Sequence, residues 1–186
     1  MYSTQQLRDE HEGIKVMLSV LEHLAGELRR GHAVNLDHLA AILDFLRTFA
    51  DKCHHGKEED VLFPALAAAG LPTEGGPIGV MLHEHTEGRA HIAGMTDALA
   101  RLRAGENAAA DFAQHALDYI ALLRAHIDKE NHILFVIAEQ RLPPAAHQQL
   151  ARDFDRIEEE RIGEDVHERY HKLIHELRNT YLEKAA

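Results

Sequence analysis

The sequence contains two similar stretches, HHGKEEDVLF at residues 54–63 and HIDKENHILF at residues 126–135. In both stretches a Glu follows a His by four residues, a Lys directly precedes that Glu, and a Phe comes five residues after it. Residues four apart lie one turn apart on the same face of an α-helix, so each His–Glu pair can direct both side chains at one point. The repetition predicts two half-sites carried by long helices.

A further histidine lies upstream of each stretch. Glu10-His11 precedes the first stretch and Glu84-His85 precedes the second, which extends the internal repeat over most of the chain. His83 is an alternative to His85, but two residues apart on a helix the two side chains point in nearly opposite directions. The Glu that directly precedes both matched histidines favours His85 as the counterpart of His11.

The pattern of apolar residues indicates an all-α fold. Apolar side chains recur every three or four positions along nearly the whole chain, and no alternating strand pattern of useful length occurs. We expect residues 1–142 to form an up-down four-helix bundle. Residues 143–186 are expected to form a C-terminal helical extension, a fifth helix at about 145–182, that packs on or covers the bundle. Pro64 is expected to kink or end the second helix.

Composition limits the partners and the location of the protein. The 186 residues include 20 basic and 31 acidic side chains, a net charge of −11, which argues against nucleic acid or an anionic membrane as a main partner. No apolar run approaches the roughly 20 residues needed to span a bilayer. The polar N-terminus lacks the apolar core of a signal peptide, so we expect a cytoplasmic location. The single Cys53 excludes an internal disulfide.

The repeated residues are typical metal ligands. Imidazole nitrogen with carboxylate oxygen suits iron, manganese or zinc, and the absence of paired cysteines argues against a thiolate site. One ambiguity concerns the first stretch, where His55 and Glu59 have the same spacing as His54 and Glu58. Matching the flanking Lys and Phe of the two stretches favours His54 and Glu58. His55 and Glu59 are then expected about 100° round the helix, beside the site or at the surface.

Taken together, these motifs resemble the hemerythrin-like family, four-helix bundles with an HHE cation-binding motif, over roughly residues 5–140. The resemblance implies a non-haem centre of two iron ions with an oxo or hydroxo bridge, in preference to zinc or manganese. It also implies bridging glutamates and a small oxidant, namely dioxygen, peroxide or nitric oxide, at an open iron position. The ligands that it implies are His11, His54, Glu58, His85, His126 and Glu130.

The sequence departs from oxygen-carrying hemerythrins at one position. Those proteins have a His-x-x-x-His pair on the third helix, whereas Met81 lies four residues before His85 here. The set is thus one ligand short, which argues against reversible oxygen transport. In the C-terminal segment His167, His171 and His175 lie four residues apart. Two interpretations stay open: a solvated polar face, or a stripe from which His167 or His171 fills the vacant metal position or covers the entrance to the site.

Two kinds of function fit these residues. In the first, a di-iron protein binds or reduces oxygen, peroxide or nitric oxide, with weak catalase- or oxidase-type turnover as its enzymatic form. In the second, a metal- or oxygen-responsive sensor or an iron-handling protein uses the same site without catalytic turnover, and the C-terminal segment provides the output.

Overall fold

The computed structural model describes residues 2–161 and 163–183, and every regular element in this part of the chain is helical, with no strand. Helical structure covers the two halves of the sequence repeat and the C-terminal segment. The elements are α1 (Thr4–Arg29), α2 (Leu36–Phe45), η1 (Leu46–His55), η2 (Glu58–Leu62), α3 (Phe63–Ala68), α4 (Pro77–Arg103), α5 (Ala109–Lys129), η3 (Glu130–Leu134), α6 (Phe135–Arg141), α7 (Pro144–Arg161) and α8 (Glu164–Tyr181). The all-α prediction is confirmed.

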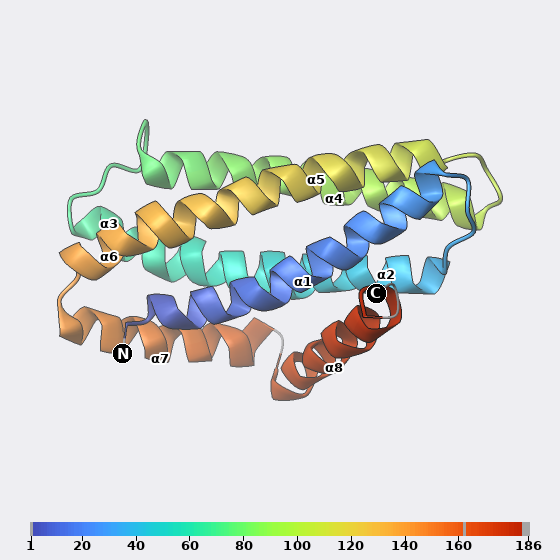
Figure 1. The fold of residues 1–186 in the computed structure, drawn as a ribbon. Helices are drawn as coiled ribbons and strands as arrows, with labels where there is room; N and C mark the ends of the chain where they lie inside the picture. Colours follow the sequence, from blue (N-terminus) through green and yellow to red (C-terminus); the bar gives the residue numbers. More distant parts are fainter. Residues whose placement is uncertain (1, 162, 184–186) are drawn as a thin grey trace.

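Four long rods form the bundle. They are α1, the continuous run from α2 to α3, α4, and the run from α5 to α6 (Figure 1). The α5 rod packs against both α4 and α1. Gly31 and Gly105 lie in the tight turns after α1 and α4 with φ of 76° and 81°, a left-handed conformation that glycine adopts without steric cost. These short turns make neighbouring rods antiparallel, as the sequence predicts.

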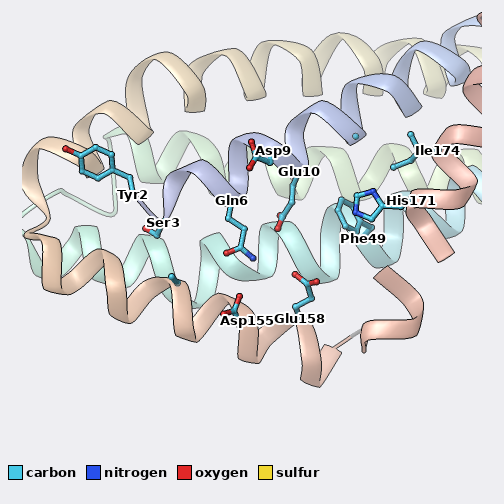
Figure 2. A pocket seen from close by; sticks show the side chains of 12 residues that line it. Tyr2, Ser3, Gln6, Asp9, Glu10, Phe49, Asp155, Glu158, His171 and Ile174 are labelled. Atoms are coloured by element: carbon cyan, nitrogen blue, oxygen red, sulfur yellow. The ribbon is translucent and has the colours of Figure 1, made fainter. Parts of the chain in front are cut away.

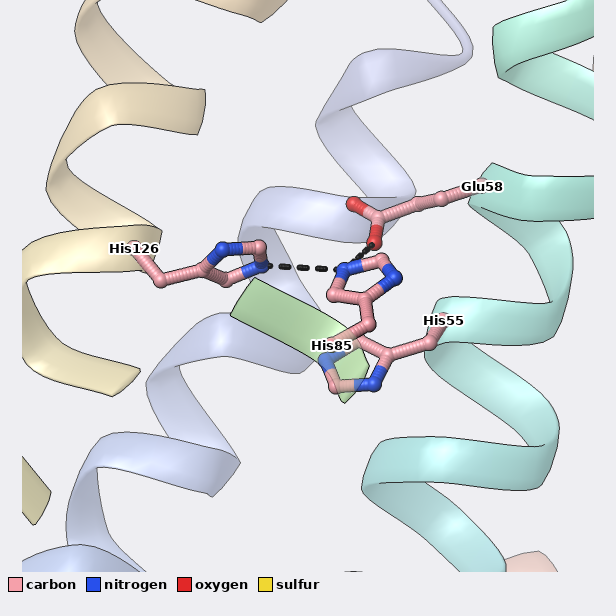
Figure 3. A group of neighbouring side chains, drawn as sticks. All are labelled: His55, Glu58, His85 and His126. Atoms are coloured by element: carbon pink, nitrogen blue, oxygen red, sulfur yellow. Dashed lines mark hydrogen bonds and ion pairs between the residues drawn. The ribbon is translucent and has the colours of Figure 1, made fainter. Parts of the chain in front are cut away.

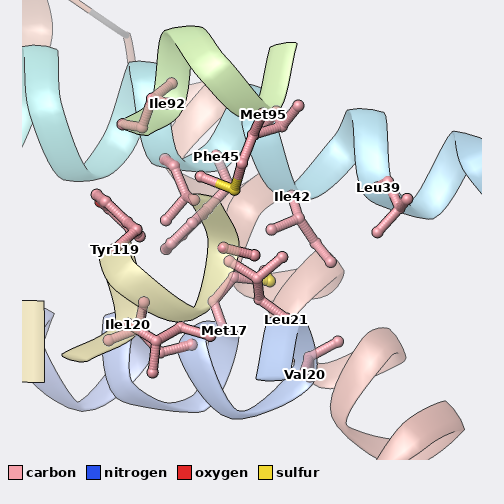
Figure 4. Close-up of a cluster of buried hydrophobic side chains, with 14 of the residues drawn as sticks. Met17, Val20, Leu21, Leu39, Ile42, Phe45, Ile92, Met95, Tyr119 and Ile120 are labelled. Carbon is pink, nitrogen blue, oxygen red and sulfur yellow. The ribbon is translucent and has the colours of Figure 1, made fainter. Parts of the chain in front are cut away.

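Two apolar clusters fill the bundle and leave a polar layer between them. The larger cluster includes Met17 of α1, Met95 of α4 and Ile120 of α5 (Figure 4). The smaller cluster includes Leu7 from the first turns of α1 and Met81 from the beginning of α4. Because these clusters lie on either side of His11, His54, His85 and His126, apolar side chains close the polar layer at both ends.

The second rod contains π-helical turns, in which each N–H bonds to the carbonyl five residues earlier instead of four. These turns form η1 and η2, and η3 is the matching π-helical segment in the second half of the repeat. Helical structure continues through Pro64 into α3 and ends at Ala68, so Pro64 does not end the rod. Pro64 is the second residue of α3, directly after the π-helical turn η2.

The C-terminal segment contains two helices where the sequence suggests one. Gly163 has φ of 75° and separates α7 from α8. The α7 helix packs against η1 and η2, whereas α8 packs against α1, so both lie on the outside of the bundle (Figure 1). In the described ranges no helix is long and apolar enough to cross a membrane.

Candidate metal centre

Seven buried side chains converge in the polar layer and form two groups of possible metal ligands. The three-histidine group contains His55, Glu58, His85 and His126 (Figure 3). The two-histidine group contains His11, His54, Glu58 and Glu130. Within each group the ligand atoms lie within 4.8 Å of one another, and none of these side chains belongs to a residue more than 4% exposed.

Glu58 faces both groups. Its Oε1 lies 3.6 Å from Nε2 of His54, in the two-histidine group, and its Oε2 lies 3.5 Å from Nε2 of His85, in the three-histidine group. Glu130 repeats this arrangement, because its Oε2 lies 3.2 Å from Nε2 of His11 and its Oε1 lies 3.2 Å from Nε2 of His126. Each carboxylate can therefore offer one oxygen to each of two cations.

Outer carboxylates orient two of the histidines in the same way in both halves of the repeat. Nδ1–H of His54 donates to Oε2 of Glu10 at 2.7 Å, and Nδ1–H of His126 donates to Oε2 of Glu84 at 2.9 Å. A lysine one residue before the ligand Glu of each half binds the other oxygen of that outer carboxylate. Each Nδ1–H bond fixes the tautomer that leaves Nε2 free as a metal ligand.

The remaining histidines are also held through Nδ1. His85 donates to Oε1 of Glu59 at 2.7 Å. His55 lies 3.4 Å from Oδ1 of Asp51, and Arg89 binds both of these outer carboxylates. Asn131 orients the imidazole of His11 on α1, because its Oδ1 lies 3.0 Å from Nδ1 of His11. All five imidazoles thus direct Nε2 toward the interior of the bundle.

Six polar atoms at the centre have no hydrogen-bond partner in the described part of the protein. Nε2 of His11, Nε2 of His54 and both oxygens of Glu58 and of Glu130 are buried and unpaired in the described structure. Leaving a buried polar atom without a partner costs about 1–3 kcal/mol, and more for a charged group. Six such atoms around one small space fit two divalent cations with nitrogen and oxygen ligands, such as iron, manganese or zinc.

The pKa values of His126 and Glu130 are shifted by the interaction between these two buried groups. Burial alone would lower the pKa of His126, but the nearby charge of Glu130 raises that pKa to about 10. Burial alone would raise the pKa of Glu130, but the nearby charge of His126 holds it well below the usual range. Each of these two groups therefore stabilises the charged form of the other.

His55 is the residue that the sequence repeat places incorrectly. The repeat predicts His55 beside the site or at the surface, whereas the structure places it in the three-histidine group, with its ring stacked on that of His85 at 3.8 Å. His54 and Glu58 lie together in the other group, as the repeat predicts. The π-helical turn of η1 explains the difference: a wider turn rotates successive residues by less than 100°, so two adjacent histidines can face the interior.

The additional histidine compensates for Met81. Met81 is buried in the smaller apolar cluster and offers no nitrogen ligand. With His55 the two groups together offer five imidazoles and two carboxylates, so η1 can supply the nitrogen ligand that α4 lacks. Burial and the neighbouring charge of His85 lower the pKa of His55 well below its usual value, which keeps its ring neutral and able to bind a cation.

The two C-terminal histidines whose side chains the structure describes, His171 and His175, lie elsewhere. His171 is exposed and belongs to neither ligand group; it lines a cavity of about 510 Å³ between the bundle and the C-terminal helices, together with Glu10 and Glu158 (Figure 2). The side chain of His167 lies outside the described part of the structure. His175 is exposed and lies near Asn179, one turn later on α8.

Glu59 lies beside the site, as one of the two sequence-based expectations for it states. Sequence reasoning missed the other outer partners, although a signal for two of them was present. Glu10 and Glu84 occupy equivalent positions directly before the matched histidines, and the structure gives both the same role. Asp51 had no such signal, because it orients His55, whose counterpart in the repeat is Ile127.

Comparison with known proteins agrees with this geometry. The family model described as the hemerythrin HHE cation-binding domain matches residues 3–138, which include all seven ligand candidates. No curated protein and no solved structure matches the chain. The match covers the four rods of the bundle except the last residues of α6, and it ends before α7. On this match, together with the two groups of buried histidines and glutamates, the chain belongs to the hemerythrin HHE cation-binding family.

Proposed function

We propose that this protein is a non-haem di-iron protein that binds or reduces a small oxidant, namely dioxygen, peroxide or nitric oxide. The observation that carries the proposal is the pair of carboxylates, Glu58 and Glu130, each of which faces both histidine groups. A carboxylate with one oxygen toward each group can hold two cations close together and offset their mutual repulsion.

The two groups differ in the ligands that they offer. The three-histidine group has one more imidazole than the two-histidine group. A cation held by His11 and His54 would therefore have fewer protein ligands, and we propose that the oxidant binds on that side. When bound, iron supplies the redox change and a position for the oxidant. The protein holds the imidazoles in one tautomer, and its apolar clusters limit the access of water.

Metal content and absorption test this proposal together. We expect about two irons per chain by elemental analysis and near-ultraviolet charge-transfer bands that change when oxygen is added. Because each carboxylate faces both groups, Glu58→Gln and Glu130→Gln should each lower the binding of both irons. Glu87→Ala, at an exposed position on α4, is the control and should retain two irons. A colourless protein with a single zinc would contradict the proposal.

A second candidate function is that of a metal- or oxygen-responsive sensor or iron-handling protein without turnover. The observation that favours it is the ion pair between Lys57, adjacent to the ligand Glu58, and Glu158 of α7, which connects the centre to a C-terminal helix. Peroxide consumption distinguishes the two functions. Iron-dependent loss of peroxide over many turnovers favours the enzyme, whereas stoichiometric reaction followed by a change in α7 favours the sensor.

A further inference from the structure

A continuous series of hydrogen bonds leads from the two-histidine group to the C-terminal helix α7. Nδ1–H of His54 donates to Oε2 of Glu10 at 2.7 Å, and Lys57 donates to Oε1 of the same carboxylate at 2.6 Å. The ammonium of Lys57 also donates to Oε2 of Glu158 at 2.7 Å. Glu10 and Glu158 face each other from α1 and α7 in Figure 2. Three hydrogen bonds thus separate the imidazole of a metal ligand from α7.

The second half of the repeat lacks the last of these bonds. Lys129 is the counterpart of Lys57 and binds Glu84, which orients His126. The side chain of Lys129 is 36% exposed, whereas that of Lys57 is completely buried. Water can solvate the charge of Lys129, but Lys57 depends on carboxylates for compensation. The bond from the lysine to a carboxylate of α7 is therefore made in the first half of the repeat, by Lys57, and has no counterpart at Lys129.

Polar and apolar contacts hold α7 in place beside this series of hydrogen bonds. Arg161, at the end of α7, donates to the backbone carbonyl of Lys52 at 2.9 Å and pairs with Asp60. A Cβ atom on Gly56 would lie 2.0 Å from Nη1 of Arg161, so glycine at this position lets the guanidinium cross the rod. Phe154 and Ile157 bury the inner face of α7. The position of Glu158 over Lys57 is consequently well determined.

We propose that Glu158 is a positioning residue through which α7 controls the affinity of the two-histidine group for its cation. Glu158 shares the charge of Lys57 and leaves Glu10 a stronger acceptor for Nδ1–H of His54. A stronger acceptor raises the basicity of His54 as a ligand. Without Glu158, Lys57 draws on Glu10 alone, and the cation on this side is held less tightly. By linkage, cation binding must in turn stabilise the docked position of α7.

Titration with Co²⁺ tests this inference, which rests on the proposed two-metal centre. Calorimetry and the visible absorption of bound Co²⁺ count two sites in the unaltered chain, and His54→Ala and His55→Ala assign them to the two groups. Glu158→Gln should weaken the two-histidine site about tenfold, near the lower end of the effect of losing a direct partner of a ligand, and leave the other site unchanged. Glu159→Gln removes the same charge from an exposed neighbour on α7 and should change neither site.

A second variant and a second measurement make the outcome decisive. Glu158→Asp keeps the charge and shortens the side chain by one carbon, so it should weaken Co²⁺ binding at the same site by a smaller factor. This variant provides the test if Glu158→Gln does not fold. Hydrogen exchange of residues 144–161 should slow when Co²⁺ is added to the unaltered chain, and less so in Glu158→Gln. If the unaltered chain does not bind two cations, the two-metal proposal fails. If it does, equal Co²⁺ affinities in Glu158→Gln and the unaltered chain overturn the role of Glu158.

Discussion

Replacing His55 by isoleucine tests whether this histidine is a metal ligand or a packing residue. Isoleucine is the residue that the repeat itself has at the equivalent position, Ile127, where it is 2% exposed. In the metal-free protein the imidazole of His55 is buried and neutral, and its Nδ1 lies 3.4 Å from Asp51, a long hydrogen bond. Asp51 keeps Arg89 as a partner after the substitution.

The substitution should have effects of opposite sign with and without metal. Removing a poorly bonded polar ring and burying an apolar side chain in its place should stabilise the metal-free protein by about 1 kcal/mol. Loss of an imidazole ligand should weaken the cation of the three-histidine group by at least about 10–100-fold, the effect of removing a partner of a ligand. With metal in excess, that factor lowers the free energy by which metal binding stabilises the folded protein by about 1.4–2.7 kcal/mol.

Thermal unfolding with and without metal gives both quantities. For a chain of this size about 1 kcal/mol shifts Tm by about 2–4 °C, so metal-free His55→Ile should melt about 2–4 °C higher than the unaltered chain. Its metal-induced increase in Tm should be smaller by about 3–10 °C. The control is His147→Leu, because His147 is also buried but pairs with Ser3 outside both groups. An unchanged metal-induced increase in His55→Ile would refute the assignment of His55 as a ligand.

Three further predictions concern pH, helix packing and symmetry. The metal-free protein should be most stable to urea between pH 4.5 and 6.5. The lowered pKa of Glu130 contributes stability that is fully present above pH 4.5 and is lost as the pH falls below it, and the pKa of His126, raised to about 10, contributes stability that is fully present below pH 6.5 and is lost toward pH 10; a flat profile would contradict this. Gly56→Ala should stabilise by about 1 kcal/mol in an Arg161→Ala background through helix propensity, but not in the unaltered chain, where its Cβ displaces the guanidinium; equal effects in the two backgrounds would exclude that clash. Glu84→Gln should weaken Co²⁺ binding by the three-histidine group about 10–100-fold and spare the other group, and weakening of both would indicate a structural effect.

The internal repeat and the helical period of the sequence predict the histidines that occupy equivalent positions in the two halves. His11 with His85 and His54 with His126 occupy equivalent positions in the two halves, and a period of 3.6 residues brings them to the same layer of the bundle. His55 breaks the pattern, because its orientation depends on the π-helical turn of η1. That turn follows from backbone hydrogen bonds that no spacing of side chains in the sequence reveals.

The C-terminal segment shows the same limit of sequence reasoning. Charged residues and a histidine stripe predict a helix there, and the chain is helical on both sides of Gly163. Glycine in the left-handed conformation directs α8 onto α1, away from α7. His171 consequently lies at a cavity and outside the ligand groups, while Glu158, which no motif marks, contacts Lys57 beside the centre.

The two departures from the repeat act on opposite sides of the centre. His55 adds an imidazole to the three-histidine group, whereas Glu158 acts through Lys57 on His54 in the two-histidine group. Two identical half-sites would give two equivalent cations, and neither would be favoured for binding an oxidant or for responding to α7. If two cations bind as proposed, one group supplies the additional nitrogen ligand and the other has the connection to α7. The cation with the more open coordination would then also be the one coupled to the C-terminal helix. Oxidant binding and the docking of α7 should therefore influence each other through His54.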